Sequence, residues 1–432
     1  MPLWLIPTFY AVASIAAGFL LPRLEINLLT ARLEMSISSA QAYLSAVASG
    51  MMALTGIVFS IAFVLVQFNA VVYSPRLVIW FARDRLLFHS LGMFVATFMY
   101  SLATLAWVDR QDGQGVPFLS AAIVAAMLVA SVLMLAQLVQ RLNNLQIMRV
   151  LQELGDTGRS VIASTYAGLP WSTSEQAAPR QQQFEEYALT VKHIGNPQSV
   201  IAIDIAKLVE HARQVNGLVV MECAVGDTLL EDTAILHANV ANSVAFKRRL
   251  VSCIHMGDQR TFEQDPKYAI RLLVDVAIKA LSPAINDPTT AVQAIDQIED
   301  LLRRLAKHDL DACRAFDRDG VLRVIYQMPT WEDYLALAFD EIRQFGSTSI
   351  QVMRRLRSAL VELAGCISSE RAKGVHTYLE HLDSGIERSS FDPEDRAAAR
   401  IEDRQGLGLS HRLEGDAEAS TRPAEPARWL GS

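Results

Sequence analysis

Residues 35–75 contain no charged side chain, and this stretch limits the fold more than any other feature of the sequence. Three more uncharged apolar runs lie in the same N-terminal third, at residues 3–21, 86–108 and 116–140. A helix needs about 20 apolar residues to cross a bilayer, because hydrocarbon offers the backbone no hydrogen-bond partner. We therefore predict four transmembrane helices, over residues 3–21, 42–72, 86–108 and 116–140.

Charge is divided unevenly between the first 150 residues and the rest. Residues 1–150 carry eight Arg, no Lys and five acidic residues, whereas the remainder carries 31 basic and 41 acidic residues. A mildly acidic soluble part argues against a nucleic-acid partner, because phosphate binding needs a concentrated basic face. The four cysteines are far apart and form no C-x-x-C pair, which favours reduced thiols over a disulfide framework or a zinc site.

The arginines that flank the predicted spans indicate which side of the membrane holds the soluble part. Four spans put both termini on one side, and that side carries five flanking arginines against three on the other. The five are Arg76, Arg83, Arg85, Arg141 and Arg149, and the three are Arg23, Arg32 and Arg110. Positive charge marks the cytoplasmic side, so we expect both termini and the soluble part there. We expect Arg76, Arg83 and Arg85 to anchor the chain at the lipid headgroups, with a cytoplasmic vestibule as the alternative.

The second predicted span carries small residues at helical spacing. They are Ser45, Ser49, Gly56 and Ser60. Small side chains let membrane helices approach closely, so we favour packing within a four-helix bundle. The alternative is a face for self-association or a stripe that lines a pore. Gln67 lies near the cytoplasmic end of this span, where its amide faces protein, a wet cavity or the headgroups.

Beyond the spans, which we assign to a domain of residues 1–150, the sequence predicts three regions and a tail. Residues 151–185 are predicted to be a helical extension and linker, residues 186–260 a small β-rich subdomain, and residues 261–382 a helical subdomain. Residues 383–432 have little to bury and are expected to be a disordered tail. The predicted fold class is an α-helical membrane domain of four transmembrane helices followed by a cytoplasmic α+β domain.

Two apolar stretches around the turn at Gly226-Asp227 predict a β-hairpin. This segment resembles the hairpin of barrel-sandwich (biotinyl/lipoyl-like) domains, so we expect the β-rich part to be barrel-sandwich-like. The lysine that such carriers modify is missing, since Leu236-His237-Ala238-Asn239 follows instead. The resemblance therefore implies a scaffold without a covalent cofactor.

A polar loop at residues 282–290 is the strongest candidate site in the soluble part. Asp287 and Pro288 suit the start of a helix, because Asp accepts its free amides and Pro has no amide to lose. We favour this structural role, and the alternative is a ligand site beside the helix N-terminus. The upstream residues Arg260 and Asp265 are expected to fold against the loop. The ligand-binding candidates are Arg260, Asp265, Asn286, Asp287, Thr289 and Thr290.

Catalytic motifs are missing from the sequence. It has no H-E-x-x-H, P-loop, G-x-G-x-x-G or G-x-S-x-G pattern. We therefore predict no catalytic residue, no metal site and no cofactor, and nothing argues for an enzyme. The predicted spans also hold no buried ionisable residue, which disfavours an ion-coupled transporter.

Two segments carry a resemblance to a known family. Tyr73-Ser74-Pro75-Arg76-Leu77 with Arg83-Asp84-Arg85 resembles the membrane half of the bacterial DUF2254 family, and residues 281–291 resemble its soluble half. The family is a domain of unknown function. The resemblance implies a bacterial inner-membrane protein, and it supplies no catalytic residues.

Two functional hypotheses follow, and we favour the first. In the first, the protein is an oligomeric channel or transport protein whose cytoplasmic domain gates it. In the second, it is a membrane-anchored ligand-binding or scaffolding module that acts as a sensor without transport. A membrane-bound enzyme comes third. The expected partners are the lipid bilayer, further copies of the chain, and a small ligand or ion.

Overall fold

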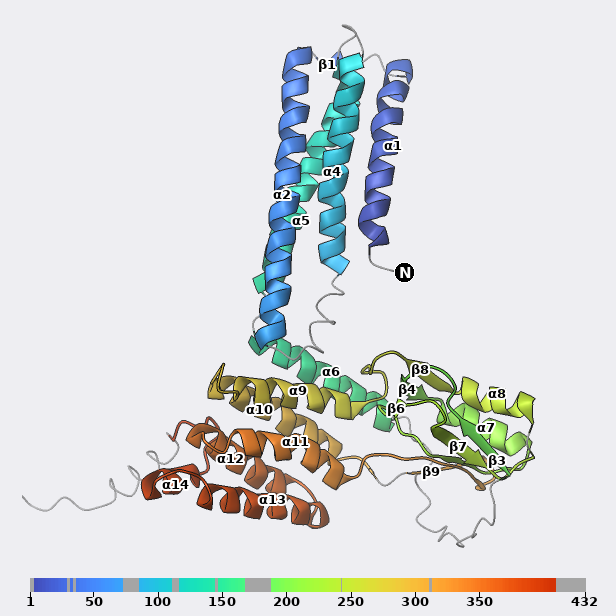
Figure 1. The fold of residues 1–432 in the computed structure, drawn as a ribbon, viewed down its shortest axis with the longest axis vertical. Coiled ribbons are helices and arrows are strands. Elements are labelled where there is room, and N and C mark those ends of the chain that lie inside the picture. Colours follow the sequence, from blue (N-terminus) through green and yellow to red (C-terminus); the bar gives the residue numbers. More distant parts are fainter. Residues whose placement is uncertain are drawn as a thin grey trace, which may run out of the picture. The chain divides into compact units, whose positions relative to one another are not determined.

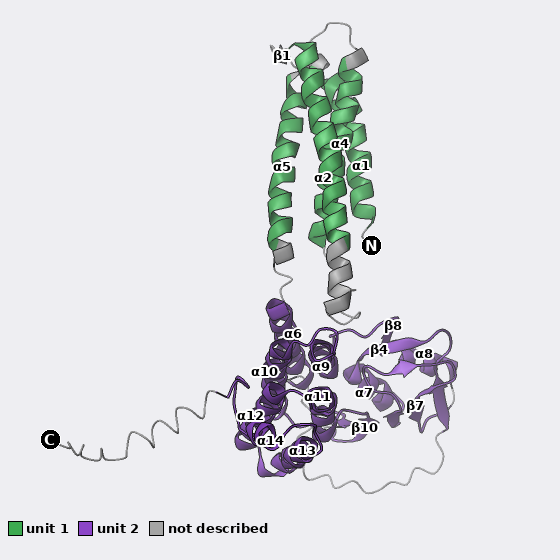
Figure 2. Cartoon of the chain, turned by 60° about the vertical axis from the view of Figure 1, so that its left-hand side comes forward, with its two compact units in different colours: residues 1–146 green, residues 147–432 purple. Residues whose placement is uncertain are grey.

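The computed structural model describes residues 4–28, 32–33, 36–72, 85–110, 116–143, 147–167, 188–241, 243–310 and 313–408. The chain divides into two compact units, residues 1–146 and residues 147–432 (Figure 2). The predicted boundary at residue 150 is therefore close to the observed one. Of the predicted helical extension and linker at residues 151–185, the part after residue 167 lies outside the described residues.

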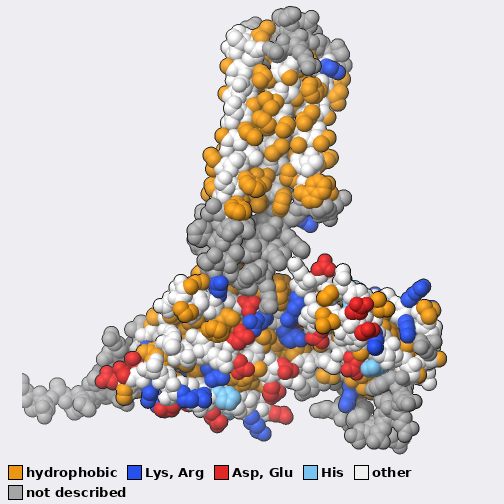
Figure 3. Space-filling model, viewed as in Figure 1, with side chains coloured by type: hydrophobic (Ala, Val, Ile, Leu, Met, Phe, Trp, Pro, Cys, Tyr) orange, Lys and Arg blue, Asp and Glu red, His pale blue; other side chains and the backbone are white. Residues whose placement is uncertain are grey.

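Unit 1 is a bundle of long apolar helices (Figure 1). Its elements are α1 (Leu5–Leu28), β1 (Arg32–Leu33), α2 (Ile37–Val72), α4 (Arg85–Arg110), β2 (Val116–Pro117) and α5 (Phe118–Asn143). Within the described residues, four helices are long and apolar enough to cross a membrane, as predicted. On the face that Figure 3 shows, uncharged side chains cover almost all of this bundle, while Lys, Arg, Asp and Glu gather on unit 2.

The uncharged second run forms one continuous helix. It begins at Ile37, five residues before the start of the predicted span at residue 42. With 36 residues, α2 is about 54 Å long, and the hydrocarbon core of a bilayer is only about 30 Å thick. The helix is therefore longer than one perpendicular crossing requires.

Helix α4 packs against α1, α2 and α5. Glycines permit its close approach to α1. A Cβ atom on Gly18 of α1 would lie 2.6 Å from the Cβ of Ala103, and one on Gly92 of α4 would lie 2.9 Å from the Tyr10 ring. Small residues thus let α1 and α4 approach closely within the bundle.

Unit 2 combines two small sheets with a group of helices. The five-stranded sheet has the order β3 (Leu189–Lys192), β7 (Ala234–Ala238), β5 (Val219–Met221), β10 (Leu322–Ile325), β9 (Arg314–Phe316), and the three-stranded sheet has the order β6 (Thr228–Leu229), β4 (Gln198–Ile203), β8 (Ile254–Gly257). The helices are α6 (Ile147–Ala167), α7 (Ile205–Gln214), α8 (Val244–Ser252), α9 (Pro266–Ala280), α10 (Pro288–Leu305), α11 (Trp331–Phe345), α12 (Ile350–Cys366), α13 (Ser369–Glu387) and α14 (Pro393–Ala399).

The expected hairpin around Gly226-Asp227 is only partly present. Strands β5 and β7 pair antiparallel, with Met221 opposite Leu236, but residues 222–233 lie between them. The barrel-sandwich likeness rests on this pair alone and stays a prediction. Strand β6 does not continue the hairpin, because it pairs with β4 in the other sheet. The side chains between the strands and α7 form one apolar core, which includes Leu208, Val219 and Val324.

The expectation of an all-helical chain after residue 260 is wrong. Strands β9 and β10 leave the helical part and complete the sheet, where β10 runs parallel to β5. The turn between them is held by Asp317, whose carboxylate accepts hydrogen bonds from the amides of Asp319 and Val321 and from Arg323. The two sequence regions predicted as separate subdomains therefore interlock.

The expected disorder from residue 383 onward is also wrong for residues 383–408. Helix α13 continues to Glu387 and α14 follows, and the side chains of Leu382 and Ala399 are buried. Arginine and carboxylate pairs supplement this small apolar contact, as between Arg400 and Glu387. Residues 409–432 lie outside the described part of the chain.

Candidate functional site

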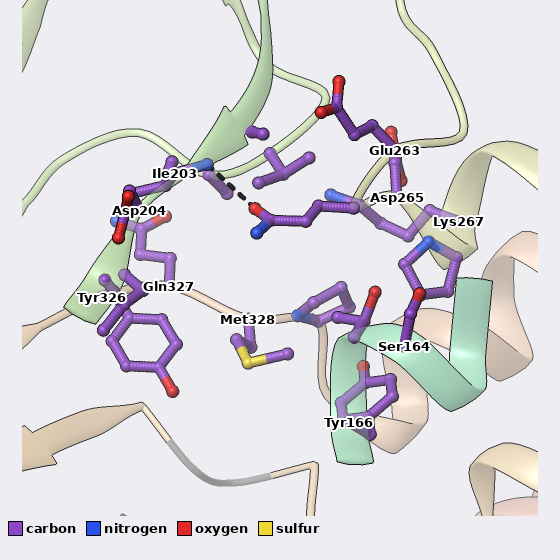
Figure 4. A pocket seen from close by; sticks show the side chains of 18 of the residues that line it. Ser164, Tyr166, Ile203, Asp204, Glu263, Asp265, Lys267, Tyr326, Gln327 and Met328 are labelled. Carbon is purple, nitrogen blue, oxygen red and sulfur yellow. Dashed lines mark hydrogen bonds between the residues drawn. The ribbon is translucent and has the colours of Figure 1, made fainter. Parts of the chain in front are cut away.

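A cavity of about 480 Å³ lies within unit 2, where the helical part meets the strands (Figure 4). It is lined by residues 164–166, 202–206, 224–225, 255, 263–267, 326–329 and 334. In Figure 4, Asp204 and Tyr326 lie on one side of the cavity, and Ser164, Tyr166 and Lys267 lie on the opposite side. Cavities of this volume hold small organic molecules.

The start of α9 forms one wall of the cavity and carries a buried ion pair. Asp265 caps the helix through the Tyr268 amide at 3.2 Å, and its Oδ2 accepts hydrogen bonds from Arg260 Nε at 2.9 Å and Nη2 at 2.6 Å. The side chain of Asp265 is 2% exposed and that of Arg260 is 30% exposed. Burial raises the pKa of the Asp265 carboxyl group, and the Arg260 charge opposes this shift.

Two contacts join this wall to the sheets. Gly226 has a φ of +92°, and a Cβ atom there would lie 2.6 Å from Asp265 Oδ2. The Ile203 amide at the end of β4 donates a hydrogen bond of 2.9 Å to Gln264 Oε1, which Figure 4 marks with a dashed line. The turn that carries Gly226 thus needs glycine both for its backbone and for its distance to the ion pair.

Three tyrosines give the cavity buried hydroxyl groups. The hydroxyls of Tyr166 and Tyr334 lie 2.9 Å apart in a hydrogen bond, and Tyr326 lines the cavity on the β10 side. Burial raises the pKa of Tyr166 and of Tyr326 to about 12. All three phenols therefore stay protonated at neutral pH and are able to donate hydrogen bonds.

Charged groups of both signs line the cavity. Asp204 caps α7 and pairs with Lys207 at 2.7 Å. Burial raises the pKa of Asp204, but the Lys207 ammonium and amide outweigh it, so the pKa is lowered overall. Glu263 and Lys267 complete the charged lining. Within the part of the chain that the structure describes, no group of His, Cys, Asp and Glu side chains could hold a metal ion.

The structure separates the two sets of predicted ligand residues. Arg260 and Asp265 lie at the N-terminal end of α9, whereas the loop at residues 282–290 follows its C-terminal end. The ends of this 15-residue helix are about 22 Å apart, so the expectation that they fold together is wrong.

Local contacts account for most of the 282–290 loop. Both carboxylate oxygens of Asp287 are used, since they accept hydrogen bonds from the Thr290 amide and hydroxyl. Asn286 has a φ of +51°, a conformation that Asn tolerates better than most residues. The side chains of Asn286 and Thr289 are exposed. These contacts agree with the favoured structural role, and ligand binding by the loop stays a prediction.

The small-residue face of α2 is exposed on unit 1. It consists of Ser45, Ser49, Gly56 and Ser60, and a Cβ atom on Gly56 would meet nothing within 4 Å. The prediction that this face packs inside the bundle is therefore wrong, and the alternative of self-association or a pore remains.

Arg85 is the exposed first residue of α4. Gln67 is a residue of α2, but its side chain is outside the described part of the structure. Arg76 and Arg83 lie outside the described residues altogether.

Comparison with known proteins identifies the family. Residues 1–362 match the family model described as "Predicted membrane protein (DUF2254)". The chain belongs to this family. Uncharacterized proteins of Mycobacterium bovis and Mycobacterium tuberculosis are 27% identical to it over 410 residues, which is 91% of this chain and 78% of theirs. No solved structure matches the chain significantly.

Sequence reasoning missed two sets of residues in this DUF2254 protein. The cavity tyrosines come from separate parts of the sequence and belong to no local motif, so no sequence signal identifies them. Glu25 lies beyond the first predicted span, which ends at residue 21. Helix α1 instead continues to Leu28 and Glu25 is only 4% exposed, so the expectation that no ionisable residue is buried there is wrong.

Proposed function

We propose that this DUF2254 protein is a membrane-anchored ligand-binding module, in which unit 2 binds a small polar molecule and unit 1 holds it at the membrane. The cavity carries this proposal, because its volume suits a small molecule and its lining mixes apolar side chains with converging polar groups. In the loop at residues 282–290, by contrast, the side chains of Asn286 and Thr289 are exposed. The ligand-binding hypothesis thus gains the stronger support.

The lining favours a neutral, cationic or zwitterionic ligand over a polyanion. Asp204 is paired with Lys207, and Asp265 is paired with Arg260. Glu263 and Lys267 add one charge of each sign, so the lining carries no excess of positive charge. Phenol hydroxyls and the Gln327 amide add hydrogen-bonding groups that need no charge on the ligand. A nucleotide or another polyanion would find no excess of cationic groups there to neutralise its charge.

The arginine distribution supports a cytoplasmic location for unit 2 and both termini, with unit 1 in the inner membrane of a bacterium. Under this orientation the ligand is a cytoplasmic molecule. Expression of a reporter enzyme fused to the C-terminus tests the orientation. A reporter that is active only in the periplasm would show activity if the orientation were reversed.

Thermal unfolding of the full-length protein in detergent tests ligand binding. Choline, spermidine, glycine betaine and myo-inositol serve as probes, with inorganic phosphate as the anionic comparison. Ser164 is exposed and lines the cavity, so Ser164→Trp should fill it, while Ala163→Trp on the adjacent exposed position should not. We expect at least one organic probe to raise the midpoint in wild type and in Ala163→Trp but not in Ser164→Trp. Equal stabilisation of all three proteins would contradict the site.

An oligomeric channel gated by unit 2 is the second candidate, and the exposed small-residue face of α2 favours it. A face without bulky side chains lets the helices of neighbouring copies approach closely. Ionic current through the protein in planar bilayers tests this function, with Gly56→Leu as the variant that blocks close approach. Unitary currents that disappear in Gly56→Leu would support a channel, and unchanged currents would exclude a pore along this face.

A further inference from the structure

The interior of unit 1 contains a line of hydroxyl groups on one face of α4. Ser90, Thr97, Ser101 and Thr104 are at most 1% exposed, and we call them the hydroxyl row. Their spacing of seven, four and three residues places them on one side of the helix. From Ser90 to Thr104 the row extends about 21 Å along the helix axis. It therefore runs along most of the apolar thickness of a bilayer.

Most of these hydroxyls have no hydrogen-bond partner. The oxygens of Ser90, Ser101 and Thr104 are buried without one, and so is the phenol oxygen of Tyr100 beside them. Thr97 shows the contrast, because its hydroxyl bonds to the Met93 carbonyl at 2.8 Å and to Ser131 Oγ at 3.0 Å. Burying a hydroxyl without a partner is costly, so such groups usually bond to another protein group or to an ordered water molecule.

A buried carboxylate marks one end of the row. Glu25 of α1 accepts hydrogen bonds from the amides of Leu119 and Ser120 at 2.6 and 3.1 Å and from Ser120 Oγ at 3.2 Å. The phenol of Tyr100 lies near Glu25, Thr104 and Ser120. Glu25 thus lies beside the unpaired hydroxyls.

An imidazole marks the other end. His89 precedes Ser90 on α4, and its Nδ1 lies 3.4 Å from the hydroxyl of Tyr10 on α1. Carboxylate and imidazole groups take up and release protons, and ionisable groups buried in membrane helices commonly mark proton or ion pathways. Unit 1 therefore has an ionisable group at each end of the hydroxyl row, of whose four members Ser90, Ser101 and Thr104 lack a partner.

We propose that water occupies the hydroxyl row and that unit 1 conducts protons along it between Glu25 and His89. For each proton that enters at one end, another leaves at the other end, so charge crosses the unit while every group regains its original protonation. The pathway runs inside one copy of the chain. It is therefore independent of the α2 face that an oligomeric pore would use, and of ligand binding in unit 2.

Proton uptake by proteoliposomes tests the proposal. The full-length protein is reconstituted with an internal pH-sensitive dye, and a potassium gradient with valinomycin drives protons inward. We expect uptake at least tenfold faster than in protein-free liposomes. The double variant Ser101→Ala with Thr104→Val removes two hydroxyls with little change in volume, and Glu25→Gln removes the charge. Each should slow uptake by at least tenfold.

Thr8→Val is the matched control, because the Thr8 hydroxyl is exposed on α1 and bonds to the Trp4 carbonyl. It should conduct at the wild-type rate. If Glu25→Gln fails to fold because α5 loses its cap, the hydroxyl variant alone decides the outcome. Wild-type uptake equal to that of protein-free liposomes would overturn the proposal. So would wild-type uptake by a folded Ser101→Ala, Thr104→Val protein.

Discussion

At the scale of single residues, the two Asp-Pro helix starts show how the same local motif serves different roles. Asp265 and Asp287 both cap a helix whose first residue is proline. Sequence predicts the cap at Asp287 because it depends only on neighbours. The ion pair that buries Asp265 depends on Gly226 some forty residues upstream, so no local pattern reveals it.

Replacing each aspartate with alanine should separate these roles. Asp287→Ala removes a cap and should cost about 1 kcal/mol of unfolding free energy. Asp265→Ala also leaves the Arg260 charge without its partner, so it should cost about 2–4 kcal/mol, discounted because Arg260 is 30% exposed. Denaturant unfolding of the full-length protein measures both. Equal losses would show that the ion pair adds nothing to the cap.

The cavity tyrosines predict a loss of stability in alkali. Burial raises the pKa of Tyr166 to about 12, above the ordinary value of 10. The folded state holds its proton more tightly than the unfolded state, so the stabilisation is complete below pH 10 and is lost as the pH rises toward 12. Wild type should lose about 1–3 kcal/mol more than Tyr166→Phe between about pH 9 and 12. Parallel pH profiles from chemical unfolding would contradict this burial.

At the scale of elements, sequence reasoning succeeds where the signal is local and fails where it is not. Thr330 and Asp333 stand at the spacing of a capping box, which predicts a helix over residues 331–345. The structure confirms this prediction, because α11 has these bounds and both hydrogen bonds of the box. Strand β10 has four residues, and its parallel partner β5 lies about a hundred residues earlier. A short strand with a distant partner leaves too little periodicity to detect. The cavity lining comes from seven separate stretches of the chain, so no local sequence pattern predicts it.

Two helical glycines should respond to alanine with opposite signs. A Cβ atom on Gly158 of α6 would lie 2.8 Å from Leu301 Cδ1 and 3.0 Å from Ala269 Cβ, whereas one on Gly365 of α12 would meet nothing within 4 Å. Gly365→Ala should stabilise the protein by about 0.5–1 kcal/mol through helix propensity. Gly158→Ala should destabilise it, because overpacking between α6, α9 and α10 outweighs that gain. Thermal midpoints of the two variants check the signs, and stabilisation by both would contradict the close packing of α6.

At the scale of the whole molecule, the two units differ in the environment that each one suits. Unit 1 is apolar enough for the membrane, and unit 2 has its own core and sheets. A unit with its own core is expected to fold alone. A fragment of residues 147–432 should therefore be soluble and keep the secondary structure of unit 2, which circular dichroism checks. Aggregation of this fragment in the absence of detergent would show that unit 2 depends on unit 1.

The most direct test of the proposed function is native mass spectrometry of the full-length protein extracted gently from its own membranes. A small non-lipid molecule should remain bound to the wild type and to Ala163→Trp, and should be missing from Ser164→Trp, whose tryptophan fills the cavity. Its fragmentation would also identify the ligand. The same bound mass on Ser164→Trp, or a wild type without any bound small molecule, would contradict a ligand in the cavity of unit 2.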